Sequence, residues 1–525
     1  MNHIELFAGC GGLSLGLEES GFELTLANEL SPMAAETFAY NFLAEDLSEL
    51  AVEGESQSKA LWLSSQYKNT DLAHRLRENP FQYPLMGDAE TDMPAEPTDL
   101  LGKLVVGSIV ELNKFLEKRT AHRMALRDGF GNGGVDLVSG GPPCQSFSMA
   151  GLRKKDCEKN VLPWEFAKFV KMVQPKFAVL ENVTGILRPF TENGVNYYAW
   201  FEVAKAFAEI GYVPLCLHVN ARLAGVPQNR PRFIMISVRL NVYRALENNL
   251  NENEKKLFKP GFDFQRKVNR NTSTVKFGDL SYFDVKQSSH IELFKDSFLE
   301  NLVNQREVTV KEALDDLRFN GKAEKSDFVN NLNATFDREL ESGQTPNHER
   351  RNNGELVQRR FRLYQVLQKC ERSVVKEVFS ILKHQGRTLS NEAWGILAGY
   401  KYLIEGQAYR KFKLAEKADF IKFLQAHPTK KQTQKALDAS SPAPAALSIP
   451  DDACHYDDHE LRTLTVREMA RIQSFPDSFT FRSKITTGGQ MRRFEVPQYT
   501  QVGNAVPPLL GLALGSAIAN LLDRI

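Results

Sequence analysis

The first thirty residues most constrain the fold of this chain. An apolar run at residues 4–7 is typical of a strand, a glycine-rich turn follows at 8–12, and residues 13–20 have a helical pattern. A second apolar run lies at 24–27. A strand, a glycine turn, a helix and a second strand in this order begin many nucleotide-binding α/β sheets. We therefore expect an α/β protein whose sheet starts at its first residues.

The glycine turn and the acidic residue beyond it suggest a ligand. The turn FAGCGG is not a full GxGxxG, because Ser14 stands where the third glycine would fall, so alone it predicts only a tight turn. Glu29 ends the second strand twenty residues after Gly9, where a carboxylate can accept hydrogen bonds from ribose hydroxyls. Taken singly, Glu29 is equally well an exposed helix cap. Together the two features favour a cofactor that contains adenosine.

Short apolar runs continue at α/β spacing to about residue 240. They lie at residues 105–106, 135–138, 177–180 and 233–238. They predict a parallel or mixed sheet with helices on both faces.

Changes in composition and in apolar patterning along the sequence predict how the chain divides into domains. We expect a main domain at 1–240 that includes a polar insertion at 43–103 and is completed by 500–525, and a second, smaller domain at 241–499. Between residues 341 and 440, 19 Lys and Arg face 10 Asp and Glu, although the whole chain has a net charge of only +1. Any binding of nucleic acid must therefore come from a local basic surface.

Cysteine usage and hydropathy bear on the cellular compartment. The six cysteines contain no CxxC pair, which argues against a zinc module or a disulfide framework and fits a reducing cytoplasm. The first residues lack a basic segment followed by an apolar one, so no secretory signal is expected. The apolar stretch at 506–522 contains two prolines, a serine and an asparagine, and predicts a buried terminal helix rather than a membrane span.

The segment SGGPPCQSFS contains the strongest candidate nucleophile. Cys144 follows a predicted strand and two prolines, so a stiff backbone holds it at the carboxyl edge of the sheet, where α/β sites lie. A lone cysteine is usually a small buried side chain. The flanking prolines and glycines make a core position unfavourable here, and no histidine is near in sequence to form a protease-like pair.

Two further segments lie at the same predicted edge. Glu181 follows the strand at 177–180 and is either an acid–base group or a surface residue. Arg230 and Arg232 precede the strand at 233–238 and, at alternate positions, point the same way. They could grip a carbonyl, a phosphate or a carboxylate, or each could be a solvated charge.

The ordered segments FAGCGG, GGPPCQSFS, ENV, QNRPR, RTLTVREMARIQSFP and QVGNAVPP resemble the DNA (cytosine-5)-methyltransferase family, of the bacterial restriction-modification type. The resemblance covers 1–42, 104–240 and 455–525, and leaves 43–103 and 241–454 without recognisable motifs. It implies a Rossmann-like domain that depends on S-adenosylmethionine, with a smaller target-recognition domain. An RNA cytosine methyltransferase, acting on tRNA, is the alternative within the same chemistry; a catalytically inactive DNA-binding homologue and a thiol hydrolase are alternatives outside it.

The resemblance also implies residue roles. Cys144 would add to carbon 6 of a cytosine flipped out of the duplex, Glu181 would act at ring nitrogen 3, Arg232 would hold the ring oxygen, and Arg230 would support the same pocket or the Cys144 loop. No metal is implied. The expected cofactor-binding residues are Phe7, Gly9, Cys10, Gly11, Gly12, Glu29, Ser108, Ile109, Pro143, Leu162, Asn504 and Val506.

Two positions depart from the family pattern. Ser108 stands where an aspartate often holds the adenine amino group, and Leu30 replaces a frequent aromatic residue. The expected partners are double-stranded DNA and a cognate restriction endonuclease or other defence proteins, with the enzyme a monomer on DNA in the bacterial cytoplasm, near the nucleoid. The basic runs at 347–351 and 359–360 are the first candidates for DNA contact.

Overall fold

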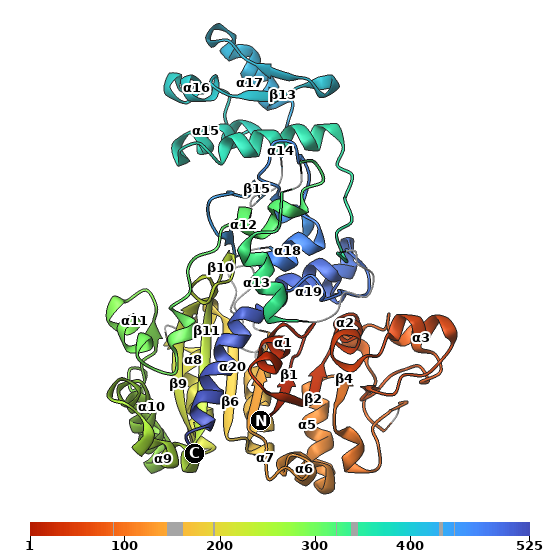
Figure 1. The fold of residues 1–525 in the computed structure, drawn as a ribbon, viewed down its shortest axis with the longest axis vertical. Coiled ribbons are helices and arrows are strands. Elements are labelled where there is room, and N and C mark those ends of the chain that lie inside the picture. Colours follow the sequence, from red (N-terminus) through yellow and green to blue (C-terminus); the bar gives the residue numbers. More distant parts are fainter. Residues whose placement is uncertain are drawn as a thin grey trace.

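A computed structural model describes most of the chain, and Figure 1 shows a broad α/β lobe below a narrower stack of helices. The described residues are 1–87, 89–143, 161–192, 195–321, 323–337, 345–429, 434–445 and 447–525.

A nine-stranded sheet forms the centre of the lower lobe, in the order β12-β9-β11-β6-β5-β1-β2-β4-β3. All neighbouring strands are parallel except β11, which is antiparallel to both β6 and β9. The expected α/β class with a mixed sheet is confirmed. The strands are β1 (Asn2–Leu6), β2 (Glu23–Glu29), β3 (Ala60–Trp62), β4 (Lys103–Val106), β5 (Leu137–Gly140), β6 (Phe177–Val183), β9 (Tyr212–Asn220), β11 (Pro231–Arg239) and β12 (Phe283–Asp284).

Helices lie on both faces of this sheet because its strands are apolar on both sides. Along β6, Ala178 and Leu180 join the core beneath α5, α7 and α8, whereas Phe177 and Val179 join the core beneath α1, α9 and α20. Successive side chains of a strand point to opposite faces, so one strand supplies two cores. The helices of the lower lobe are α1 (Gly12–Glu19), α2 (Pro32–Leu43), α3 (Leu47–Glu53), α4 (Leu72–Arg75), α5 (Ile109–Lys118), α6 (Thr120–Arg127), α7 (Leu162–Val173), α8 (Ala199–Glu209), α9 (Leu240–Leu246), α10 (Glu252–Arg270), α11 (Ser288–Lys295) and α20 (Pro508–Leu522).

The sheet extends past both boundaries that the sequence suggested. β3 lies inside the expected insertion at 43–103, where Ala60 and Trp62 are wholly buried, and β3 forms one edge of the sheet. β12 lies beyond residue 240 and forms the other edge by pairing with β9. The segment at 43–103 is therefore partly integral to the sheet, and the limit at residue 240 falls too early for the lobe that contains the sheet.

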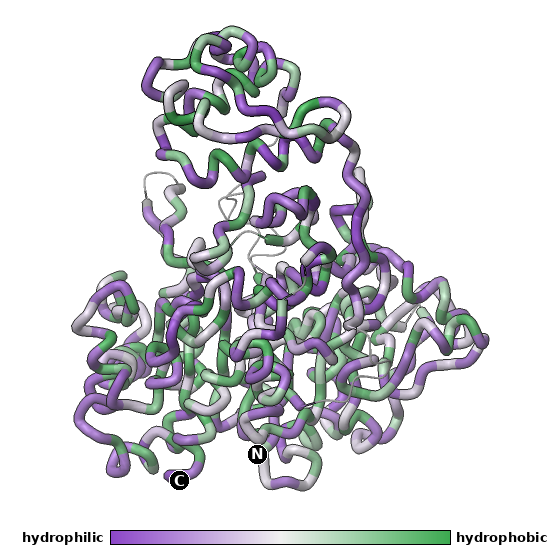
Figure 2. The backbone as a smooth tube through the Cα atoms, turned by 45° about the horizontal axis from the view of Figure 1, so that its top comes forward, coloured by the Kyte–Doolittle hydropathy of each residue, from purple (hydrophilic) through white to green (hydrophobic). Residues whose placement is uncertain are grey.

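The upper part of the molecule has two hydrophobic cores of its own. One lies beside the lower lobe and is formed largely by α12 (Val310–Leu314), α13 (Asp327–Thr335), α18 (Val466–Ile472) and α19 (Gln498–Asn504). The other lies at the far end (Figure 1), and we call residues 355–429, whose core Ala436 and Cys454 complete, the outer subdomain. Figure 2 shows a hydrophilic connection that leads to it. Its elements include α14 (Glu355–Leu367), α15 (Arg372–Leu382), α16 (Asn391–Leu397), α17 (Lys417–Gln425), β13 (Lys401–Leu403) and β14 (Tyr409–Lys411).

The apolar stretch near the C-terminus forms α20, which packs against α1 so closely that a Cβ on Gly16 would lie 2.3 Å from the Leu512 nitrogen. Among the described residues no single helix has both the length and the hydrophobicity to cross a membrane. One pair bent by 66°, Gly489–Asn504 with Pro508–Leu522, meets those criteria only when its two helices are taken together.

Candidate active site

A buried ion pair lies at the carboxyl edge of the sheet. Glu181 on β6 faces Ile234 of the antiparallel β11, two pairs away from Val183 and Arg232. The Arg232 Nε lies 2.6 Å from the Glu181 Oε1 in an ion pair, and both side chains are about one-tenth exposed. Two neighbouring strands thus hold the carboxylate and the guanidinium in fixed positions.

The loop that leads to Cys144 passes directly over this pair. Gly140 pairs with Leu180, the Asn182 Nδ2 donates to the Pro142 carbonyl over 3.0 Å, and a Cβ on Gly141 would lie 3.1 Å from the Glu181 Oε2. Cys144 itself lies outside the described residues, and Pro143 before it is exposed. The structure brings the approach to Cys144, Glu181 and Arg232 to one place, as the sequence predicted for the edge of the sheet.

Arg230 lies deeper than Arg232, at 3% exposure. Its Nη2 donates to the carbonyls of Gly503 and Ala505, each over 2.9 Å, and its Nη1 lies 3.5 Å from the Gln228 Oε1. Burial lowers the pKa of Arg230 well below its usual range; the charge of Arg232 adds to this, and Glu181 opposes it. The hydrogen bonds of Arg230 therefore join the catalytic strand to the C-terminal segment.

The glycine turn after β1 and Glu29 after β2 meet at the same edge. The backbone amide of Gly9 donates to the Glu29 Oε2 and that of Ser31 to Oε1, each over 2.8 Å. Burial raises the pKa of Glu29, and these backbone hydrogen bonds oppose the rise. Phe7 has a φ of 56°, a left-handed conformation that costs a non-glycine residue about 1–3 kcal/mol and is often found at functional sites.

The C-terminal segment closes over the glycine turn. A Cβ on Gly12 would lie 2.2 Å from the Val506 carbonyl oxygen, so only glycine allows this approach. Asn504 is exposed and Val506 is half-buried beside it. Segments almost five hundred residues apart therefore form one surface.

The other predicted cofactor residues occupy varied positions. Cys10 is buried, its Sγ lies 3.7 Å from the Gln501 carbonyl, and burial raises its pKa, so only its backbone can face a ligand. Ile109 belongs to the core. Ser108 caps α5, accepting from the Val110 amide over 3.2 Å, and Leu162 is half-buried at the start of α7.

Comparison with known proteins decides the family. A family model described as C-5 cytosine-specific DNA methylase matches residues 1–60 and 116–520. The chain belongs to this family. The predicted DNA (cytosine-5)-methyltransferase is thereby confirmed, and the family depends on S-adenosylmethionine.

Curated relatives of this methyltransferase match along nearly its whole length. It is 26% identical to the type II methyltransferase M.DdeI of Desulfomicrobium norvegicum, over 100% of this chain and 90% of that protein. It is 25% identical to M1.HphI of Haemophilus parahaemolyticus, over 99% and 87%. It is also 25% identical to M.Bpa9945I of Bacillus paralicheniformis, over 99% of each protein.

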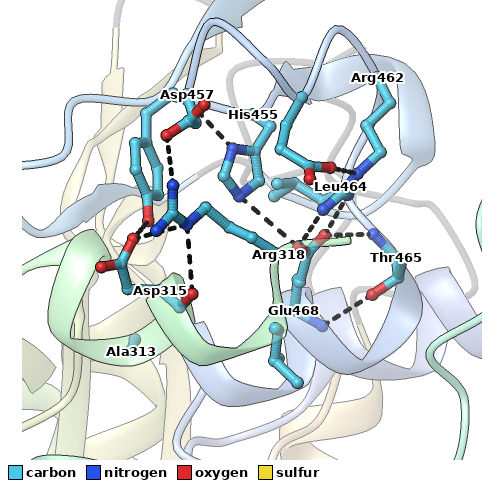
Figure 3. Close-up of polar contacts among 12 residues, drawn as sticks. Ala313, Asp315, Arg318, His455, Asp457, Arg462, Leu464, Thr465 and Glu468 are labelled. Atoms are coloured by element: carbon cyan, nitrogen blue, oxygen red, sulfur yellow. Dashed lines mark hydrogen bonds and ion pairs between the residues drawn. The ribbon is translucent and has the colours of Figure 1, made fainter. Parts of the chain in front are cut away.

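The segment RTLTVREMARIQSFP of the methyltransferase contains arginines whose role the sequence did not reveal. Figure 3 shows Arg462 meeting Glu468, with both guanidinium–carboxylate distances 2.7 Å, while Arg462 also contacts Glu460. Thr465 caps α18 in a reciprocal arrangement with Glu468. These side chains are almost wholly buried, so the Arg462 guanidinium is paired with two carboxylates inside the upper core.

Arg471, one turn after Glu468, has the same kind of environment. It contacts Asp316 over 2.6 Å and Asp477 over 2.7 Å, and its side chain is fully buried. We call Arg462, Arg471 and their four carboxylates the junction network, because it lies between the lower lobe and the outer subdomain. In the sequence, the only sign of this network was the cluster of charged residues among the apolar residues of the segment RTLTVREMARIQSFP.

The structure places the residues of the two basic runs proposed for DNA contact in different environments, some buried and some exposed. Asn347 is buried and donates to the Phe481 carbonyl over 2.9 Å, and His348 bridges the Thr465 Oγ1 and the Leu317 carbonyl. These two residues are structural. Arg350 and Arg351 are exposed. Farther along, Arg359 lies 3.6 Å from Glu405 and Arg360 donates to the Pro428 carbonyl, so both already have partners.

Proposed function

We propose that this protein methylates carbon 5 of a cytosine flipped out of a specific double-stranded DNA sequence, through a covalent adduct with Cys144. The observation that carries the proposal is the position of the Glu181–Arg232 pair beneath the loop that leads to Cys144. An acid and a hydrogen-bond donor held by rigid strands next to a nucleophile suit an addition to an aromatic ring.

The first step overcomes the low nucleophilicity of carbon 5. The Cys144 thiolate forms a bond to carbon 6, and the electron pair of the carbon 5–carbon 6 double bond moves into the ring. Glu181 stabilises this charge by donating a proton or a hydrogen bond at nitrogen 3. Arg232 holds the Glu181 carboxyl group and can also donate to the ring oxygen.

The second step transfers the methyl group and restores the enzyme. S-adenosylmethionine supplies, when bound, a methyl group on a positively charged sulfur. Glu29 and the glycine turn would hold this cofactor, which would supply the methyl group that carbon 5 of the adduct takes up. Loss of the carbon 5 proton to water and expulsion of the Cys144 thiolate then give 5-methylcytosine.

The residues after β1 and β2 fit this cofactor. A Cβ added to Gly9 would meet no atom within 4 Å, so space lies open above the turn. Each Glu29 oxygen is fixed by one backbone amide and retains a lone pair for a ribose hydroxyl. Arg230 would keep Asn504 and Val506 beside this space through the carbonyls of Gly503 and Ala505.

A place in restriction and modification is also part of the proposal. The relatives reported above are named type II methyltransferases. By analogy, methylation by this protein would protect one short sequence from a cognate endonuclease or another defence protein. We further propose that the part of 241–499 that lies outside the sheet-containing lobe supplies target recognition, with the outer subdomain as the part that selects the sequence, because it has its own core and can vary independently of the sheet.

The decisive test of the covalent step uses Cys144→Ala. We expect it to abolish methylation while DNA binding remains, and the wild type to form a denaturation-resistant complex with DNA carrying 5-fluorocytosine at the target. Fluorine cannot leave as a proton does, so the adduct persists. An active Cys144→Ala enzyme would contradict the mechanism.

Glu181→Gln separates chemistry from binding. The amide keeps the shape of Glu181 but cannot donate a proton, so single-turnover methylation should slow by about 10²–10⁴-fold with cofactor affinity unchanged. Glu307→Gln, an exposed carboxylate paired with Arg222, is the control and should leave the rate unchanged. Bisulfite sequencing of DNA from expressing cells would reveal the recognised sequence, and parallel treatment of RNA would exclude or establish activity on tRNA.

A further inference from the structure

A cationic cavity lies at the edge of the sheet opposite the candidate active site. It has a volume of about 270 Å³, and its lining includes Arg127, Lys176 and Arg239. Lys176 immediately precedes β6, and Glu181 lies five residues after it, or roughly 17 Å farther along at about 3.3 Å per residue. Figure 1 shows the neighbouring helices α6, α7 and α9 at the end of the lower lobe away from the outer subdomain.

Gln174 holds two of these cations in place. Its side-chain oxygen accepts from the Arg127 Nη2, and its backbone carbonyl accepts from the Arg239 Nη1 over 2.6 Å. Gln174 has a φ of 54°, so a non-glycine residue occupies a left-handed conformation where glycine would fit without strain. The strained residue supplies the side-chain oxygen that glycine could not, and it orients both guanidinium groups toward one cavity.

The positive charges of this cavity are only partly neutralised. Arg127 and Arg239 bind neutral oxygens, and within the described part of the chain neither forms an ion pair. Lys176 is paired with Asp136 over 2.8 Å. Asp128 is the one acidic residue in the described lining of the cavity, which leaves it with a net positive charge.

The buried Tyr212 lies close to the same two arginines, Arg127 and Arg239. Its hydroxyl donates to the Pro175 carbonyl over 2.7 Å, next to Gln174. Burial raises the pKa of Tyr212, and the charges of Arg239 and Arg127 oppose that rise. Both guanidinium groups therefore act on the same small region of the protein.

We infer that this cavity binds a compact phosphate anion, either free or as the phosphate end of a nucleotide. Two guanidinium forks and an ammonium group match the oxygens of a phosphate better than they match a single carboxylate. Glycines at 133 and 134 line the same cavity, and their lack of side chains lets an anion approach the backbone. The volume suits a phosphate or pyrophosphate group and leaves a nucleoside outside.

The test is calorimetric titration of the full-length protein with inorganic phosphate, pyrophosphate and ATP. We expect saturable binding of one ion per chain, weakened at least tenfold in the double variant Arg127→Gln/Arg239→Gln. Arg123→Gln is the control, because Arg123 lies on the same helix and does not line the cavity. Tenfold tighter binding of ATP than of pyrophosphate would identify a nucleotide, and comparable affinities would identify the free anion.

Two further measurements keep the inference open to refutation. Gln174→Gly removes the side-chain oxygen and relieves the left-handed strain, so it should weaken pyrophosphate binding severalfold without lowering the melting temperature. S-adenosylmethionine affinity should be the same in all variants, which separates this site from the cofactor site. No saturable binding, or equal pyrophosphate affinity in the wild type and the double variant, would overturn the inference.

Discussion

At the edge that holds Glu181, Arg232 contacts that one carboxylate and the described partners of Arg230 are neutral oxygens. In the junction network, by contrast, Arg462 and Arg471 each contact two carboxylates. Each guanidinium of the junction network is thus fully paired with carboxylates, whereas the edge at Glu181 keeps more guanidinium groups than carboxylates. A buried charge that is fully paired contributes to a fixed fold, while an incompletely paired one remains available to a substrate. Arginine therefore has a structural role in the junction network, and we expect it to have a chemical role at the edge that holds Glu181.

The comparison is tested most severely by Arg471→Met. This change would leave the carboxylates of Asp316 and Asp477 without their buried partner, so we expect the free energy of unfolding to fall by about 3–5 kcal/mol. Urea denaturation measures it. Lys325→Gln is the control, because Lys325 contacts the same Asp477 from a half-exposed position and should cost less than about 1 kcal/mol. If both variants lost the same free energy of unfolding, the buried pairing of Arg471 would be no more important than a half-exposed contact.

Arg230→Met tests the catalytic edge. Its loss leaves the carbonyls of Gly503 and Ala505 unsatisfied and frees the segment beside the cofactor space, so S-adenosylmethionine affinity should fall about tenfold, or about 1.4 kcal/mol. Calorimetry with Arg222→Met as the control measures it, since Arg222 pairs with Glu307 at the surface. An unchanged affinity would assign Arg230 to folding alone.

The junction network should also make the free energy of unfolding depend on pH, through the buried His455 beside it. Burial lowers the pKa of His455, which lies beside the junction network, and Glu468 opposes the effect. Because the folded pKa lies below the unfolded value of about 6.5, the unfolded state binds the proton more readily, and stability is lost as the pH falls below about 6.5. The slope contributed by this one group is at most about 1.4 kcal/mol per pH unit.

His455→Gln should remove that contribution. Its free energy of unfolding should change less between about pH 7 and about pH 5.5 than that of the wild type. The exposed His459, four residues later, gives the control His459→Gln, which should behave as the wild type does. An undiminished pH dependence in His455→Gln would show that other groups dominate.

The smallest expected effect concerns Arg350, an exposed side chain before the outer subdomain. If it contacts one phosphate, Arg350→Ala should reduce the slope of log affinity for DNA against log salt by about 0.9. Filter binding at several salt concentrations measures the slope. Lys255→Ala, an exposed change on α10, should leave it unchanged.

The sequence predicted six of the nine strands, though not β9, because strands buried on both faces have continuous apolar runs. Apolar runs at 177–180 and 233–238 correspond to β6 and β11, and the residues beside them bring Glu181 and Arg232 together. The edge strands β3 and β12 were missed because they are only three and two residues long. Too few residues remain in such strands to give a periodic signal.

The junction network was not foreseen for a different reason. Charged residues are normally expected at the surface, and Arg462, Arg467 and Arg471 become core residues because carboxylates and carbonyls, some of them distant in the sequence, meet them. Asp316, for example, is separated from Arg471 by 155 positions. A single sequence contains no signal for such a pairing, although it does reveal the unusual density of charge in the segment.

Gly12 lies against Val506, and α20 packs on α1, so the two ends of the chain complete each other. During synthesis the first βαβ unit must therefore wait for the last helix before its cofactor surface exists. At about 5–20 residues per second, translation of 525 residues takes roughly half a minute to two minutes. A fragment of this chain that ends before α20 contains Glu181, Arg230 and Arg232 and still lacks the helix that packs on α1.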